Sequence, residues 1–107
     1  MEVFKELYNT ILERKADPQE GSYTSYLFKE GKEKILKKLG EESTEVVIAG
    51  MKGSKDEIVA ETGDLLYHLM VLLAEEGIPW EDIVQEMEVR RQKTGNFKGE
   101  RREIKNY

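Results

Sequence analysis

The sequence predicts an all-α protein, a small antiparallel bundle of four to five helices that is completed by dimerisation. Apolar residues recur at helical spacing along most of the chain. The only two prolines, Pro18 and Pro79, fall where that pattern breaks, and no segment shows the alternation typical of a strand. The 107 residues suit one domain. A chain of this size buries only about two-thirds of its unfolded surface, so association of copies would add cover.

The first half of the chain is expected to hold two long helices. Residues 2–15 form an amphipathic helix, with Phe4, Leu7 and Ile11 on one side. Turn residues in series make 16–22 a loop. The segment 23–31 is ambiguous and is interpreted as loop passing into helix. A long helix then runs from about Thr24 or Lys32 to Met51.

The second half is expected to add two more helices. Gly53 suits the end of one helix and Ser54 the start of the next, which spans residues 56–76. This third helix is apolar nearly all round, which predicts a central, buried position. A fourth helix covers 80–94 and opens on Trp80, a core or interface anchor. The predicted domain is 1–95, followed by a charged tail, 96–107.

The composition excludes several classes of function. The 17 basic and 22 acidic residues give a net charge of −5, which argues against a nucleic-acid groove. The absence of cysteine excludes disulfides and thiolate chemistry. No apolar run is long enough to span a bilayer, and the N-terminus lacks the apolar core of a signal peptide. We therefore expect a cytoplasmic protein with no membrane partner.

Acidic pairs at i, i+3 spacing are as frequent as chance predicts, so spacing alone carries no signal. The chain has five such pairs, and 22 acidic residues in 107 would give roughly four or five at random. Their surroundings distinguish two of them. At 100° per residue, Glu42 and Glu61 each point into the apolar stripe of their helix. Glu45 and Asp64 fall at the borders of the same stripes.

Carboxylates that converge from two antiparallel helices require a counter-charge. A buried, unpaired carboxylate is costly unless it is paired or bound to a metal. Mg²⁺, or Mn²⁺ as a substitute, prefers oxygen ligands and leaves coordination positions for water and phosphate. The alternative is ion pairing with Lys37, Lys38 or an arginine. Two matching pairs on adjacent helices favour a metal site at Glu42, Glu45, Glu61 and Asp64.

The two pairs also resemble a family signature. Glu42-x-x-Glu45 followed by Glu61-x-x-Asp64 is similar to the E-x-x-E and E-x-x-D motifs of the MazG-like superfamily of all-α nucleotide pyrophosphatases. Within it, several stretches resemble the phosphoribosyl-ATP pyrophosphatases of histidine biosynthesis. The similarity covers residues 2–95, and its matching stretches are Gly21–Thr24 with Leu27, Lys37–Glu42, Thr44–Ile48 and Asp64–Leu69.

The resemblance implies Mg²⁺-dependent hydrolysis of phosphoribosyl-ATP to phosphoribosyl-AMP and pyrophosphate. The four acids would hold the metal, and Glu42 or Glu45 would take a proton from the attacking water. Two alternatives stay open: a MazG-like NTP or dNTP pyrophosphatase, and a non-catalytic helical dimerisation module. Loss of activity on chelation would exclude the module, and substrate choice would separate the enzymes.

Other residues receive roles through the same resemblance. His68 and Glu41 are interpreted as partners that orient a carboxylate, although a lone histidine on a helix is more often a core residue. Lys38 lies one turn before Glu42, which suits either an ion pair or a phosphate contact. The residues expected to contact substrate are Ser22, Tyr23, Thr24, Lys38, Arg90 and Arg91.

Overall fold

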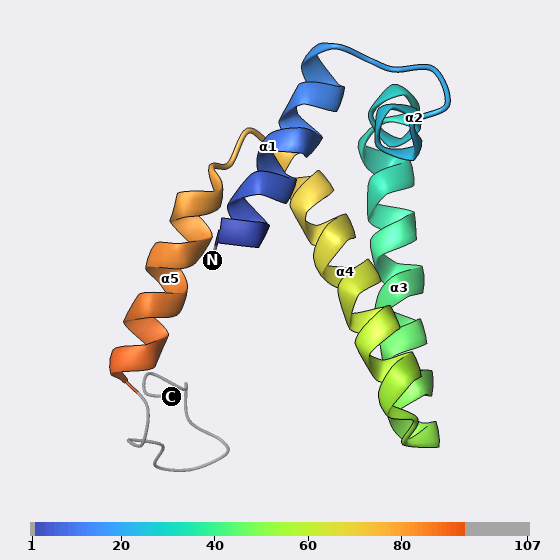
Figure 1. The fold of residues 1–107 in the computed structure, drawn as a ribbon, viewed down its shortest axis with the longest axis vertical. Coiled ribbons are helices and arrows are strands. Elements are labelled where there is room, and N and C mark those ends of the chain that lie inside the picture. The colour runs from blue at the N-terminus through green and yellow to red at the C-terminus, as the bar shows by residue number, and fades with distance from the viewer. Residues whose placement is uncertain (1, 94–107) are drawn as a thin grey trace.

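The computed structural model describes residues 2–93 and confirms the all-α class. Within that range the chain forms five helices and no strand (Figure 1). No helix among these residues is long and apolar enough to cross a membrane. The predicted tail, 96–107, lies outside the described residues. The helices are α1 (Glu2–Ala16), α2 (Tyr23–Glu30), α3 (Lys32–Lys52), α4 (Lys55–Glu75) and α5 (Trp80–Gln92).

Helix α2 is the main local difference from the sequence prediction, which left 23–31 as loop passing into helix. It begins at Tyr23 because the Ser22 side chain caps it, accepting a hydrogen bond from the Ser25 amide at 3.1 Å. It ends at Gly31, whose φ of +95° is open to glycine and strained for other residues. The long helix therefore starts at Lys32, the later of its two predicted starts.

The core lies where α1, α2 and α3 meet the C-terminal half of α4. Its largest fully buried side chains come from all four helices and are Ile11, Leu27, Ile35, Met70 and Val71. Helix α4 is central, as predicted, since it contacts each of the other three. The prediction that it is buried was wrong for its N-terminal half, where Val59 is 63% exposed. Of the five described helices, only α3 runs beside that half (Figure 1).

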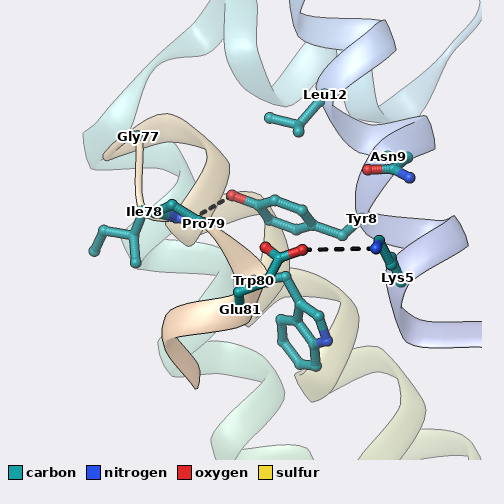
Figure 2. A pocket seen from close by; sticks show the side chains of 9 residues that line it. All are labelled: Lys5, Tyr8, Asn9, Leu12, Gly77, Ile78, Pro79, Trp80 and Glu81. Carbon is teal, nitrogen blue, oxygen red and sulfur yellow. Dashed lines mark hydrogen bonds and ion pairs between the residues drawn. The ribbon is translucent and has the colours of Figure 1, made fainter. Parts of the chain in front are cut away.

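Helix α5 is attached at its first turn and then diverges from the other helices (Figure 1). The Trp80 ring packs against Phe4 and Tyr8, with centroid separations of 5.7 and 6.2 Å. The Tyr8 hydroxyl donates to the Ile78 carbonyl, and Lys5 pairs with Glu81 at 3.9 Å (Figure 2). No residue of α5 is buried. Trp80 therefore anchors α5 to α1. This is the first of its two predicted roles, that of a core anchor.

Candidate active site

The turn between α3 and α4 places the two acidic pairs face to face. Gly53 ends α3 in the left-handed region at φ +72°, and the Ser54 side chain caps α4 by accepting from the Glu57 amide. The chain thereby reverses within two residues, and α3 and α4 pack along their length (Figure 1). The predicted helical ends at Gly53 and Ser54 are confirmed.

Three of the four predicted acids come together. One carboxylate oxygen from each of Glu42, Glu61 and Asp64 lies within 4.8 Å of the others. Glu42 and Glu61 are half-buried, whereas Asp64 is exposed. The half-buried Glu42 and Glu61 and the exposed Asp64 agree with the predicted rotation of these acids around their helices, and metal binding by them stays a prediction. The three oxygens form an acidic cluster supplied by two helices.

Glu45 stays outside this cluster but acts on it electrostatically. It is exposed on α3 and lines a small cavity that Glu61 also borders. Partial desolvation, followed by the charges of Glu45, Asp64 and Glu42, raises the pKa of the Glu61 carboxyl. The acids therefore repel one another around Glu61, and a bound cation would relieve that repulsion.

Lys38 is the cation nearest to the acidic cluster on α3. Its amino group lies 3.2 Å from a Glu41 carboxylate oxygen and 4.0 Å from a Glu42 oxygen. The hydrogen bond to Glu41 is the main cause that raises the Lys38 pKa. Glu41 and Glu42 therefore share Lys38 as their ion-pair partner. The predicted i, i+4 ion pair between Lys38 and Glu42 is present, beside the tighter contact to Glu41.

His68 is a core residue with both ring nitrogens engaged. It is 3% exposed, and its Nδ1 lies 2.7 Å from the Asp64 backbone carbonyl, which can only accept a hydrogen bond. In the neutral ring, Nε2 therefore accepts from the Tyr23 hydroxyl at 3.1 Å. The interpretation of His68 as a partner that orients a carboxylate does not match these contacts. Its bonds join the backbone of α4 to Tyr23 on α2.

Of the three predicted substrate residues near position 23, only Tyr23 faces the acids. Ser22 uses its side-chain oxygen to cap α2, and the Thr24 hydroxyl pairs with the Tyr67 hydroxyl. Burial raises the pKa of the Tyr23 hydroxyl, against the lowering effect of Lys38, and the charges of Glu42 and Asp64 also act on it. Tyr23 and Thr24 are the first two residues of α2, so they belong to a helix and not to the predicted loop.

Arg90 and Arg91 lie far from the acidic cluster within one chain. Both are near the C-terminal end of α5, on the opposite arm of the molecule from α3 and α4 (Figure 1). They pair with Glu86 at 2.9 Å and with Glu88 at 2.7 Å on the same helix. Intrachain geometry therefore gives no support to their predicted contact with the substrate.

A basic pocket beside the cluster was not predicted. It has a volume of about 260 Å³ and lies between α2 and the first half of α3. The sequence did contain its signal, because four of the lining residues follow an i, i+3, i+4, i+7 pattern on one face of α3. The lining residues are Tyr23, Tyr26, Lys34, Lys37, Lys38 and Glu41.

Comparison with known proteins identifies the family. Residues 4–91 match the family model for phosphoribosyl-ATP pyrophosphohydrolase. The chain is 51% identical to a phosphoribosyl-ATP pyrophosphatase from Clostridium novyi, over 99% of this chain and 96% of that protein. It is 52% identical to one from Lactiplantibacillus plantarum, over 99% of each. A histidine biosynthesis bifunctional protein from Caldanaerobacter subterraneus is 58% identical over 87% of this chain and 45% of its own length. The chain therefore belongs to the phosphoribosyl-ATP pyrophosphohydrolase family.

Proposed function

We propose that this phosphoribosyl-ATP pyrophosphatase of histidine biosynthesis performs its hydrolysis at the acidic cluster, with Mg²⁺ held by Glu42, Glu61 and Asp64. The reaction adds water across the α–β phosphate linkage and yields phosphoribosyl-AMP and pyrophosphate. The observation that carries the proposal is the convergence of three carboxylate oxygens within 4.8 Å from two helices. The family match removes the open alternatives of another nucleotide pyrophosphatase and of a non-catalytic module.

The donor set fits a hard divalent cation. All three ligand atoms are carboxylate oxygens, and the cluster is open to solvent on the Asp64 side, where water and phosphate can complete the coordination. Oxygens bound to one Mg²⁺ are at most about 4.2 Å apart, so small side-chain rotations would close the cluster on the ion. When bound, Mg²⁺ supplies charge neutralisation for the polyphosphate and acidifies a water.

Glu45 is the residue we assign as general base. Glu42 belongs to the acidic cluster and also faces Lys38, so its oxygens are already engaged. Glu45 lies outside the cluster, close enough to act on the Glu61 pKa, and is exposed. Its carboxylate is thus available to take the proton of the attacking water. Mn²⁺ would substitute for Mg²⁺ because both accept oxygen ligands.

We also propose that the enzyme is a homodimer and acts in the cytoplasm. Large apolar side chains remain exposed on α3 and α4 near the acidic cluster, and patches of this kind mark association surfaces. Ile48 lines the same small cavity as Glu45 and Glu61, so a partner seated there would shield the acids from water. The exposed side chains of this surface are Val47, Ile48, Met51 and Val59.

The test is pyrophosphate release from phosphoribosyl-ATP with Mg²⁺, with EDTA, and with ATP or dNTPs in its place. Glu42→Gln, Glu45→Gln, Glu61→Gln and Asp64→Asn should each lose most activity and stay folded. Asp56→Asn, on the first turn of α4 and outside the cluster, is the matched control. The metal assignment is wrong if the Glu42, Glu61 and Asp64 variants keep near-normal turnover or if EDTA leaves the wild type active, and the base assignment is wrong if Glu45→Gln does.

A further inference from the structure

We infer that the basic pocket on α3 binds the phosphate of the second ribose, with Lys34 and Lys37 as its specificity-determining residues. The inference rests on the proposed function, because it takes the acidic cluster as the place where the triphosphate is cleaved. The substrate carries a phosphoribosyl group on its adenine ring, and ATP lacks that group. The recognition of this distant phosphate therefore requires cations well away from the metal-binding acids.

The first observation is the positive charge that lines the basic pocket. Lys34 and Lys37 line the pocket and form no ion pair with any residue of 2–93, whereas their neighbour Lys38 is held by Glu41 and Glu42. Two ammonium groups without an ion-pair partner among the described residues thus line one cavity, whose single carboxylate, Glu41, is paired with Lys38, in a protein of net charge −5. Lys34 lies in the first turn of α3, where a positive charge is unfavourable to the helix dipole, so helix stability does not explain its place.

The second observation is position along α3. At 1.5 Å per residue, Lys37 precedes Glu42 by about 7.5 Å and Lys34 precedes it by about 12 Å along the helix axis. The spacing of three, four and seven residues keeps Lys34, Lys38 and Glu41 on one face. Lys34, Lys38 and Glu42 form an i, i+4, i+8 row in which successive residues are about 40° apart around the helix, so a ligand whose triphosphate reaches the acidic cluster could extend back along this row to the pocket that Lys34 and Lys37 line.

The third observation is the aromatic wall between these two ends. Tyr23 and Tyr26 line the pocket with ring centroids 6.1 Å apart and planes 25° apart, and they are 44% and 42% exposed. Exposed aromatic faces stack on nucleobases. The Lys34 amino group lies 5.8 Å from the Tyr26 ring centroid, which holds this cation beside the wall. Tyr23 is near enough to Glu42 and Asp64 for their charges to act on its hydroxyl, whereas Tyr26 lies beside Lys34, so the order of phosphate, base and phosphate in the substrate matches the order of acids, rings and Lys34.

The test measures binding of the product, phosphoribosyl-AMP, in EDTA by titration calorimetry, with AMP as the comparison ligand. Phosphoribosyl-AMP keeps the second phosphate but has no pyrophosphate, so its binding is independent of the metal site. Wild type should bind it more tightly than AMP. Lys34→Gln and Lys37→Gln should each weaken that binding by at least about tenfold, since each removes a charge-assisted hydrogen bond, and leave AMP binding unchanged.

Lys55→Gln is the matched control, because this lysine forms no ion pair among the described residues and lies at the opposite end of the α3–α4 pair (Figure 1). It should bind both ligands as wild type does. The inference is overturned if wild type binds the two ligands equally, or if the pocket variants match wild type. Equal loss for both ligands would also overturn it, by placing the lysines at the nucleotide's own phosphate. Loss of activity in the carboxylate variants is a separate result, so the metal assignment can stand or fall independently.

Discussion

Replacement of His68 by leucine tests whether this histidine only positions Tyr23 through its hydrogen bonds or takes part in the reaction itself. The histidine is 3% exposed and makes two hydrogen bonds, to the Asp64 carbonyl and to the Tyr23 hydroxyl. Leucine is similar in size, so it leaves little empty volume and removes both bonds. Each buried hydrogen bond contributes about 0.5–1.5 kcal/mol net, so we expect the free energy of unfolding to fall by about 1–3 kcal/mol.

The loss of stability should not exceed that of the two hydrogen bonds, because both groups that bonded to His68 have other partners. The Asp64 carbonyl lies inside α4, where the helical ladder also uses it, and Tyr23 is 44% exposed, so its hydroxyl can turn to water. Neither group is left buried and unsatisfied. For a domain of this size the loss corresponds to a melting temperature lower by about 10 °C. The measurement is thermal unfolding in EDTA at fixed protein concentration.

Enzyme kinetics test the hydrogen bond between His68 and the Tyr23 hydroxyl. Without its acceptor, Tyr23 is held less firmly in the wall of the basic pocket, so KM for phosphoribosyl-ATP should rise a few-fold. The Mg²⁺ concentration that gives half activity should not change, because both hydrogen bonds of His68 within residues 2–93 go to a hydroxyl and a backbone carbonyl and none to a carboxylate. Tyr23→Phe removes the same bond from the other side, and the double variant should cost less than the sum of the two. A His68→Leu protein of unchanged stability that loses turnover or Mg²⁺ dependence would refute this reasoning.

Two further predictions concern the acidic cluster and its surface. In EDTA, Glu61→Gln should melt no lower than wild type, because removal of this charge relieves repulsion from Glu45, Asp64 and Glu42. A raised pKa means that the folded state binds this proton first. The stabilisation from protonating Glu61 is therefore fully present below its ordinary pKa of 4.5 and is lost as pH rises through the raised folded-state pKa. Acidification from pH 7 should therefore stabilise metal-free wild type more than Glu61→Gln, and equal pH profiles would contradict it. Sedimentation should show a dimer that Val47→Glu or Met51→Glu weakens, with Lys55→Glu as a control; a stable wild-type monomer at micromolar concentration would exclude the dimer.

The direction of each acid around its helix could be predicted from the sequence. The 100° rotation per residue fixes which side chains share a face, and Glu42 and Glu61 are half-buried as that rotation requires. The axial register of α3 against α4 could not be predicted. It depends on how Gly53 and Ser54 reverse the chain, and it decides that Asp64 joins the acidic cluster and Glu45 does not.

The placement of Arg90 and Arg91 shows a second limit of sequence reasoning. Their charge suited an anionic substrate, but the course of α5 is set by the turn at Gly77 and by the packing of Trp80 on α1. These contacts join residues far apart in the chain, so periodicity contains no information about them. Helix α2 differs in this respect, because a capping serine at Ser22 and a glycine at Gly31 are local signals that can be read directly.

The face of α3 that borders the site divides into a basic part and an acidic part. Lys34 and Lys38 lie in its first half and Glu42 in its second, while Lys37 lines the pocket beside the basic part. An acidic half on its own would repel a triphosphate, so substrate affinity at that end depends on the metal. The basic half needs no metal, and it can hold the second phosphate in either state. If both proposals hold, the lysines select the substrate before the acids and their metal act on it. Phosphoribosyl-ATP would then bind detectably in EDTA, whereas ATP would not.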